Sequence, residues 1–224
     1  MQSFLVPGFS QTAGAWAEVI AALPLRTEVT ALDVPTAPTF IETVDALGDH
    51  GGRGAWVGYS MGARLVVTLA LTRPELVERV ILISGGLGIV DTEARQARAA
   101  RDDALAARAT TIGVDAFLDE WLAQPMFASL PASARRHRLT SADAIAHQLR
   151  VLGQGQMPPL RARLGDIGVP VLFLTGTDDS AYGAIARDAV TLVSNGTHVE
   201  LEGGHALLHD APQSVADAIS AFIR

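Results

Sequence analysis

The sequence predicts an α/β fold in which a mainly parallel sheet of about six strands is flanked by helices. Short apolar or β-branched runs alternate along the chain with longer segments of helical periodicity. This alternation is typical of parallel strands joined by right-handed crossover helices. The apolar runs are too continuous for half-exposed strands, so we expect helices on both faces of the sheet.

Six segments have the length and composition of buried strands, and five others have the periodicity of helices. The strands are expected at residues 3–6, 29–32, 55–58, 80–83, 169–174 and 197–201. The helices of the core are expected near residues 14–23, 40–49, 61–72, 183–193 and 211–223.

One long segment interrupts the alternation, because it contains helical patterns and no convincing strand. We therefore expect a core of residues 1–85 and 165–224, with a helical lid of residues 86–164 inserted between the fourth and fifth strands. A lid at this place would cover the carboxyl ends of the strands, where open α/β sheets bind ligands. Helices that merely thicken the domain are the alternative. The helical patterns cover residues 92–109, 114–122, 131–139 and 141–152.

The bulk composition is that of a globular protein with a negative net charge. Of the 224 residues, 49% are hydrophobic and 18% are charged, and the formal net charge is −7. A chain of this length can form one large domain. Because the sequence has no basic stripe, we expect no nucleic-acid partner. The lack of cysteine excludes disulfides, thiolate catalysis and cysteine-ligated metals.

Targeting and cofactor signals are also missing from the sequence. No basic region precedes a long apolar run, so we expect a cytoplasmic protein without a membrane partner. No metal site or organic cofactor is indicated. A dinucleotide is not expected, because no G-x-G-x-x-G motif follows the first strand. These patterns do not determine the oligomeric state.

The feature with the most chemical content is a G-x-S-x-G pentapeptide, Gly58-Tyr59-Ser60-Met61-Gly62, between an expected strand and an expected helix. On such a sharp turn the serine hydroxyl is exposed at the top of the sheet, beside backbone N–H groups. Glycine is needed at both flanks because neighbouring elements pass too close for a Cβ atom. We therefore expect Ser60 to carry the chemistry of this chain.

A serine hydroxyl needs an imidazole and a carboxylate to act as a nucleophile or base, in the chain order serine, acid, histidine. Of the six histidines, His205 lies in the loop after the last strand, from which its side chain can reach the turn. His209, one helical turn further on, is the competitor. The acid is expected after the fifth strand, where Asp179 is preferred and Asp178 remains an alternative.

Two backbone N–H groups are expected to form an oxyanion hole beside the serine. One belongs to Met61, and the other belongs to Phe9 in the loop after the first strand. Gly8 would allow the backbone of that loop to approach closely. Arg64 follows Ser60 by four residues and so lies close to the mouth of the site.

Longer motifs are shared with a known family. They are GYSMGARL (58–65), SGGLG (84–88), Arg98-x-x-x-Asp102, Trp121, QPMFASLP (124–131), LRVLGQGQMPPL (149–160), Gly176-x-x-Asp179 and Gly204-His205. On these motifs the chain resembles the α/β-hydrolase superfamily. Within that superfamily it is similar to the 2-succinyl-6-hydroxy-2,4-cyclohexadiene-1-carboxylate synthases of menaquinone biosynthesis, the MenH family. The resemblance covers the lid as well as the core.

The resemblance implies a carbon–oxygen lyase that eliminates pyruvate from a cyclohexene polycarboxylate. It implies that Ser60, activated by His205 and Asp179, abstracts a ring proton instead of attacking a carbonyl. The oxyanion donors would then stabilise an enolate-like charge.

The resemblance also implies which residues hold the substrate. Arg64, Arg98 and Arg138 would bind its carboxylates, since arginine binds carboxylates bidentately. Arg135 or Arg136 could take the place of Arg138. Pocket walls are implied for Tyr59 and Trp121.

The chain departs from the family pattern at two places near the site. The usual His-Gly-Phe of the oxyanion loop is Pro7-Gly8-Phe9, which keeps the glycine and the donor position. A lysine that often follows the acid loop is absent, and the chain reads Asp179-Ser180-Ala181-Tyr182. These departures bear on the identity of the substrate.

The alternative function is that of a carboxylesterase or thioesterase with Ser60 as a covalent nucleophile. A serine, acid and histidine alone do not distinguish the two functions. An esterase needs an apolar acyl pocket, whereas the lyase needs arginines that converge on the serine. A binding protein without catalysis is a third interpretation, against which the intact Ser60, Asp179 and His205 argue.

Overall fold

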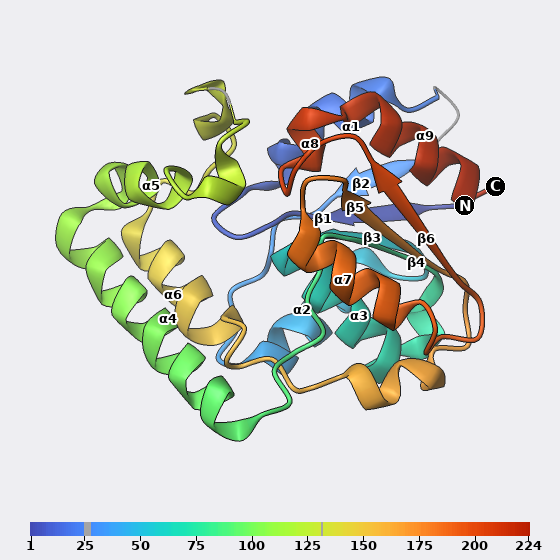
Figure 1. Ribbon diagram of the computed structural model, residues 1–224, viewed down its shortest axis with the longest axis horizontal. Coiled ribbons are helices and arrows are strands. Elements are labelled where there is room, and N and C mark those ends of the chain that lie inside the picture. The colour runs from blue at the N-terminus through green and yellow to red at the C-terminus, as the bar shows by residue number, and fades with distance from the viewer. Residues whose placement is uncertain (25–27, 131) are drawn as a thin grey trace.

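The computed structural model describes residues 1–24, 28–130 and 132–224. Its centre is a six-stranded sheet in the order β2-β1-β3-β4-β5-β6, in which all neighbouring strands are parallel (Figure 1). The prediction of a mainly parallel sheet of about six strands is confirmed. The strands are β1 (Ser3–Val6), β2 (Val29–Ala31), β3 (Gly54–Tyr59), β4 (Val77–Ile83), β5 (Val171–Gly176) and β6 (Gly196–Leu201).

The strand boundaries differ from the prediction most at β4, which was expected at residues 80–83 and begins three residues earlier, at Val77, and at β5. Strand β5 was expected at residues 169–174, and it begins two residues later, after Pro170. Proline has no N–H group to donate to a neighbouring strand. The hydrogen bonds of β5 toward the next strand therefore begin at Val171, whose N–H group donates to the carbonyl of Asn195 over 2.9 Å.

Helices cover both faces of the sheet, and each face has its own hydrophobic core. Alternate side chains of β3 point to opposite faces, as the period of a strand requires. Trp56 belongs to the core that includes residues of α2, α3 and α7, whereas Val57 belongs to the core that includes residues of α1, α8 and α9. Because both faces are covered, every residue of β3 is buried. These helices are α1 (Ala17–Ala22), α2 (Phe40–Gly51), α3 (Met61–Thr72), α7 (Ser180–Ala189), α8 (Leu207–Asp210) and α9 (Pro212–Phe222).

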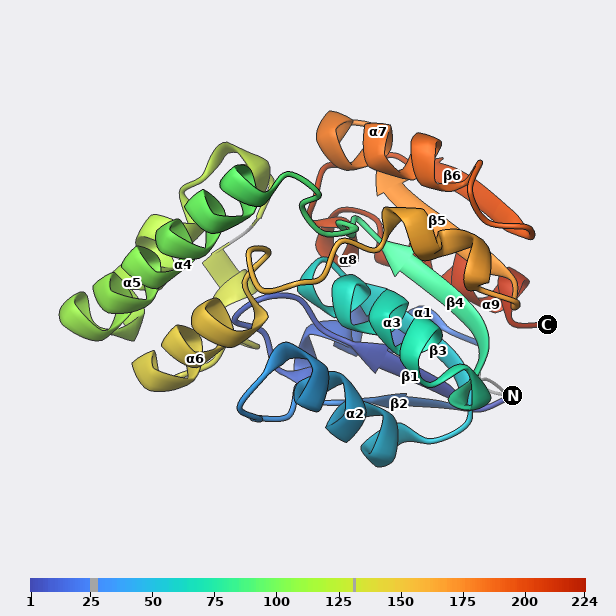
Figure 2. The same cartoon turned by 90° about the horizontal axis from the view of Figure 1, so that it is seen from below.

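A helical insert lies between β4 and β5, as expected. It contains α4 (Thr92–Ile112), α5 (Val114–Leu122) and α6 (Ala142–Leu152), which lie beyond one end of the sheet in both views (Figures 1 and 2). The insert has a hydrophobic core of its own, which includes Phe117 and Ile145. The described residues also form short 3-10 helices at Ala13–Trp16, Pro74–Leu76, Pro125–Phe127, Ala132–Arg135 and Arg161–Asp166.

The helical segment expected at residues 131–139 is confirmed only as a short 3-10 helix and is wrong beyond Arg135, and residue 131 lies outside the described residues. A 3-10 helix covers Ala132–Arg135, and the chain that follows pairs with the loop after β1. The N–H of Thr12 donates to the carbonyl of His137 over 2.9 Å, and the N–H of Leu139 donates to the carbonyl of Ser10 over 2.8 Å. These backbone hydrogen bonds require an extended chain, and they outweigh the local helical pattern.

The connection order places a crevice between β1 and β3. From β1 the chain crosses to β2 at the edge, and it then returns to β3 on the other side of β1. Ligands of open α/β sheets bind outside the carboxyl ends of the strands at such a switch point. The loop that carries Phe9 follows β1, and Ser60 follows β3. The topology thus brings the two predicted halves of the site together.

Gly62 allows α3 to begin directly against the end of β1. A Cβ atom at this position would lie 2.2 Å from the carbonyl oxygen of Val6 and 2.6 Å from that of Pro7. A Cβ atom at Gly58 would lie 2.4 Å from the carbonyl oxygen of Gly62. Both contacts are with backbone atoms, which cannot move aside as a flexible side chain could. The two glycines of the pentapeptide are therefore required by packing.

We expect Gly62→Ala to lower the free energy of unfolding by about 2 to 3 kcal/mol, because α3 must move away from β1 to admit the methyl group. Denaturant unfolding followed by circular dichroism measures this change. Gly168→Ala is the matched control, since a Cβ atom there meets no atom within 4 Å. Equal effects of the two substitutions would contradict the packing argument.

Candidate active site

Ser60 has a strained backbone at the turn from β3 into α3. Its φ is +53°, in the left-handed region that residues other than glycine rarely adopt. Its N–H group donates to the carbonyl of Ile83 at the end of β4 over 2.8 Å. Such strain persists where the surrounding structure holds the residue in place. Here the close packing at Gly58 and Gly62 and the bond to β4 do so.

A continuous chain of hydrogen bonds joins Ser60, His205 and Asp179. The Nε2 atom of His205 lies 3.1 Å from Ser60 Oγ, and its Nδ1 atom lies 2.8 Å from Asp179 Oδ2. A carboxylate can only accept, so Nδ1 carries the proton and the Nε2 atom of the neutral ring accepts from the serine hydroxyl. His205 is 3% exposed and Asp179 is 9% exposed, which keeps this chain largely away from solvent.

The sequence left two candidates for the acid and two for the histidine, and the structure distinguishes them. Asp178 is exposed, and only its neighbour Asp179 bonds to His205. His209 points elsewhere, with its Nδ1 atom 3.9 Å from a carboxylate oxygen of Glu18. The preferred pair is thus the one that the structure brings to the serine.

Phe9 and Met61, the two residues predicted as oxyanion donors, lie close to Ser60. Both residues line the cavity that contains the serine. Within the described part of the chain, neither of their N–H groups donates to another protein atom. Both residues thus combine a place at the cavity of the serine with a backbone N–H group that is not engaged in the described structure.

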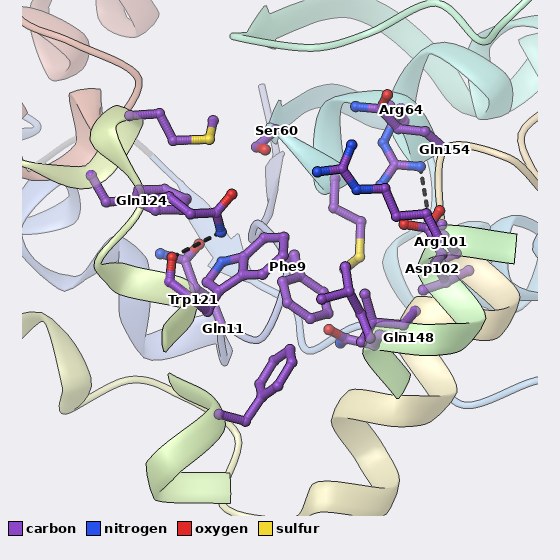
Figure 3. A pocket seen from close by; sticks show the side chains of 18 of the residues that line it. Phe9, Gln11, Ser60, Arg64, Arg101, Asp102, Trp121, Gln124, Gln148 and Gln154 are labelled. Atoms are coloured by element: carbon purple, nitrogen blue, oxygen red, sulfur yellow. Dashed lines mark hydrogen bonds between the residues drawn. The ribbon is translucent and has the colours of Figure 1, made fainter. Parts of the chain in front are cut away.

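The cavity in front of Ser60 has a volume of about 520 Å³ and is bounded by both the core and the insert. In Figure 3, Arg64 and Gln154 lie to the right of Ser60, Trp121 lies to its lower left, and Phe9 lies below it. The ring of Trp121 packs edge-on against that of Phe9, with 4.7 Å between their centroids. All five side chains expected to hold a substrate line this cavity, namely Tyr59, Arg64, Arg98, Trp121 and Arg138.

Arg64 is a buried cation at the wall of the cavity. Its side chain donates from Nη1 to the carbonyl of Leu152 over 2.6 Å, and it forms no ion pair with any carboxylate in the described residues. It is 7% exposed, and burial lowers the pKa of its guanidinium to about 10. The remaining N–H groups are available to an anion in the cavity.

Of the three neighbouring arginines considered as substrate ligands, Arg135, Arg136 and Arg138, it is Arg138 that lines the cavity. It is 7% exposed, and burial lowers the pKa of its guanidinium. From Nη1 it donates to the carbonyl of Phe9 over 3.1 Å and to Ser10 Oγ over 2.9 Å. Arg135 instead pairs with Asp119 outside the cavity, and Arg136 is exposed.

Arg98 is held at the cavity by two partners. Its Nε atom donates to Asp102 Oδ1 over 2.9 Å, and its Nη1 atom donates to Gln154 Oε1 over 2.8 Å. Asp102 is therefore already paired, as is Glu120 with Arg108. The cations of the cavity exceed its free acids, so the arrangement suits an anionic ligand.

Sequence reasoning did not anticipate Tyr182, Gln154 or Gln148 at the cavity. The ring of Tyr182 lies 4.7 Å from that of His205, between centroids, and its hydroxyl lies 3.3 Å from Gln154 Nε2. Tyr182 follows Asp179 by about one helical turn, a spacing that could have identified it. Gln154 lies in the shared segment of residues 149–160 but was given no role there, and Gln148 belongs to no motif, so only the packing of the insert places them at the cavity.

Neither a metal centre nor a membrane span is indicated by the described residues. Within them, no three side chains of His, Asp or Glu converge as metal ligands do. Likewise, none of their helices combines the length and the apolar character that a bilayer crossing needs.

The α/β-hydrolase family model matches residues 4–218. The chain belongs to the α/β-hydrolase family. This α/β-hydrolase is 31% identical over 176 residues to a putative 2-succinyl-6-hydroxy-2,4-cyclohexadiene-1-carboxylate synthase of Bacillus subtilis, a match that covers 75% of the chain and 64% of the relative. A synthase of the same name from Klebsiella pneumoniae is 30% identical, with 75% of this chain and 67% of that protein covered.

Solved structures show the same similarity. The structure of MenH from S. aureus has a TM-score of 0.91 and 26% identity, and the match covers 99% of this α/β-hydrolase and 92% of that chain. An enol-lactonase from Burkholderia xenovorans has a TM-score of 0.79 at 24% identity, over 99% and 90% of the two chains. The latter likeness shows the shared fold alone.

We expect Arg64→Met to raise the free energy of unfolding by about 1 to 2 kcal/mol, because a buried cation without a carboxylate partner destabilises the folded state. A pKa depressed to about 10 means that this cost is present at every pH below that value. Chemical denaturation at pH 7 measures the change. Arg53→Met is the matched control, since the Arg53 side chain is 72% exposed and its loss should change little. A destabilised Arg64→Met protein would contradict the argument.

Proposed function

We propose that this protein is a MenH-like lyase of the cytoplasm, acting in menaquinone biosynthesis. It eliminates pyruvate from a cyclohexene polycarboxylate and forms 2-succinyl-6-hydroxy-2,4-cyclohexadiene-1-carboxylate. The observation that carries the proposal is the presence of two buried guanidiniums, those of Arg64 and Arg138, in the cavity of Ser60, neither of which pairs with a carboxylate among the residues that the structure describes. The names of the relatives from Bacillus subtilis and Klebsiella pneumoniae support it.

The first step is the transfer of a ring proton to Ser60. As the serine oxygen takes the proton from the ring carbon, His205 Nε2 takes the serine's own proton along their 3.1 Å hydrogen bond. The imidazolium that forms is stabilised by Asp179, which accepts from Nδ1. Without this relay, a serine hydroxyl is far too weak a base.

The electrons of the broken C–H bond become a conjugated enolate-like charge. The keto oxygen of the succinyl group, which is part of the named product, receives this charge. Phe9 and Met61 line the cavity of Ser60 with N–H groups that donate to no acceptor in the described part of the chain, and such donors bind a developing oxyanion more strongly than a ground-state ketone. This difference in binding lowers the barrier to proton removal.

Elimination completes the reaction without water. The charge collapses to a second ring double bond while the carbon–oxygen bond to the pyruvate group breaks. The leaving enolate of pyruvate takes the proton that the serine–histidine pair holds, and the pair returns to its starting state. No covalent bond between Ser60 and the substrate is needed at any point.

The arginines hold the carboxylates and so direct the ring toward Ser60. Arg64 and Arg98 line the cavity, and Arg138 lines it beside the Phe9 loop. A substrate with several carboxylates can bind to both groups of cations at once, which fixes its orientation. The burial of Arg64 and Arg138 strengthens their interactions, since little water competes.

The proposal is tested by supplying the cyclohexene polycarboxylate and following the release of pyruvate. We expect release by the native protein and none by Ser60→Ala, with hydrolysis of p-nitrophenyl acetate slow by comparison. Fast ester hydrolysis without pyruvate would instead identify a carboxylesterase or thioesterase and would exclude the lyase.

Two adjacent aspartates in the loop after β5 provide a matched pair of variants for the same assay. Asp179→Asn should lower the rate by about 10⁴-fold, because an amide favours the wrong imidazole tautomer. Asp178→Asn changes the adjacent, exposed carboxylate and should leave the rate unchanged.

A further inference from the structure

The loop that carries Phe9 is held by glutamine side chains. The N–H of Gly8 donates to Gln11 Oε1 over 2.8 Å, and the N–H of Gln11 donates to the carbonyl of Gly8 over 3.2 Å. The carbonyl and N–H of one trans peptide unit point in opposite directions. Because the Gly8 carbonyl is turned toward Gln11, the Phe9 N–H of that same unit is turned away from it.

The next peptide unit is fixed at both ends by side chains of the insert. The carbonyl of Phe9 accepts from Arg138 Nη1 over 3.1 Å. The N–H of Ser10 donates to Gln148 Oε1, on α6, over 2.9 Å. Among the described contacts around Phe9, its own N–H thus stays free while the groups on either side of it are engaged.

Ser10 makes these contacts necessary. Its φ is +59°, in the left-handed region, and the residue is fully buried. A serine keeps such a conformation only where surrounding interactions compensate for the strain. The bond from its N–H to Gln148 and the bond from Leu139 to its carbonyl, over 2.8 Å, supply that compensation. Both partners lie in the segment between β4 and β5.

We propose that Gln148 is a positioning residue, which holds the Phe9 N–H in place for the oxyanion through its bond to Ser10. This role rests on the proposed function, in which Phe9 is an oxyanion donor. Gln148 is 6% exposed and lies on α6, so the insert shapes the catalytic loop as well as the cavity. Gln11 supports the same loop from the core side.

The test compares Gln148→Met, which removes the acceptor, with Gln148→Glu, which keeps an oxygen for the Ser10 N–H. For Gln148→Met we expect kcat for pyruvate release to fall about tenfold or more with KM little changed, because a misplaced donor is lost mainly from the transition state. Gln148→Glu should restore most of kcat, and its added negative charge should raise KM for an anionic substrate. Gln213→Met, at an exposed glutamine, is the control that should match the native protein.

A second readout does not depend on the natural substrate. A fluorophosphonate probe phosphonylates a serine whose oxyanion hole binds the phosphoryl oxygen, with loss of fluoride from phosphorus and of the serine proton to histidine. We expect Gln148→Met to slow the labelling of Ser60 by a similar factor and Gln148→Glu to restore it. If the native protein releases no pyruvate, the proposed function fails, while this labelling still decides the role of Gln148.

Three results would overturn the role of Gln148. They are native kcat and labelling rates in Gln148→Met, an increase of KM alone in that variant, and equal losses of kcat in Gln148→Met and Gln148→Glu. Thermal unfolding of each variant identifies any loss of the fold. If Gln148→Met does not fold, Gln11→Met tests the same loop from the core side, and a native labelling rate in it would count against the proposal.

Discussion

The first turn of α3 lies directly against the last carbonyl groups of β1, and this backbone contact sets the position of the whole site. It is possible because Gly62 has no side chain, since a Cβ atom there would lie 2.2 Å from the Val6 carbonyl oxygen. The contact places the loop after β1 next to the turn after β3. Phe9, Ser60 and Met61 therefore converge, although some fifty residues separate the loop from the turn. The strained backbone of Ser60, with φ of +53°, is a consequence of the same approach.

The insert gives this common scaffold its particular electrostatics. Arg98 and Arg138 come from the insert, and Arg64 comes from the first turns of α3, where the insert buries it against the Leu152 carbonyl. Burying cations costs folding free energy, which a cavity for neutral esters would not require. Bound carboxylates would offset this cost, because a ligand that binds only the folded state stabilises the folded state. In this account the arginines, and not the serine, determine which reaction the site performs.

Local patterns predicted much of the fold and the core of the site. The continuous apolar strands, the glycine-flanked Ser60 and the loop positions of Asp179 and His205 each reflect constraints that act over a few residues. The sequence could not distinguish Asp178 from Asp179, because their choice depends on which side chain the end of β5 turns inward. It also misassigned residues 136–139 as helix, since the pairing of this segment with the loop after β1 spans more than a hundred residues of sequence. Gln148 was missed for the same reason.

The central claim is that Ser60 moves a proton and forms no covalent bond with its substrate. The most direct measurement is a single-turnover reaction on substrate deuterated at the ring carbon that loses its proton, combined with intact-protein mass spectrometry during turnover. The account predicts a slower reaction with the deuterated substrate and an unmodified Ser60 throughout. A rate insensitive to deuterium, together with a transient adduct of substrate mass on Ser60, would contradict it.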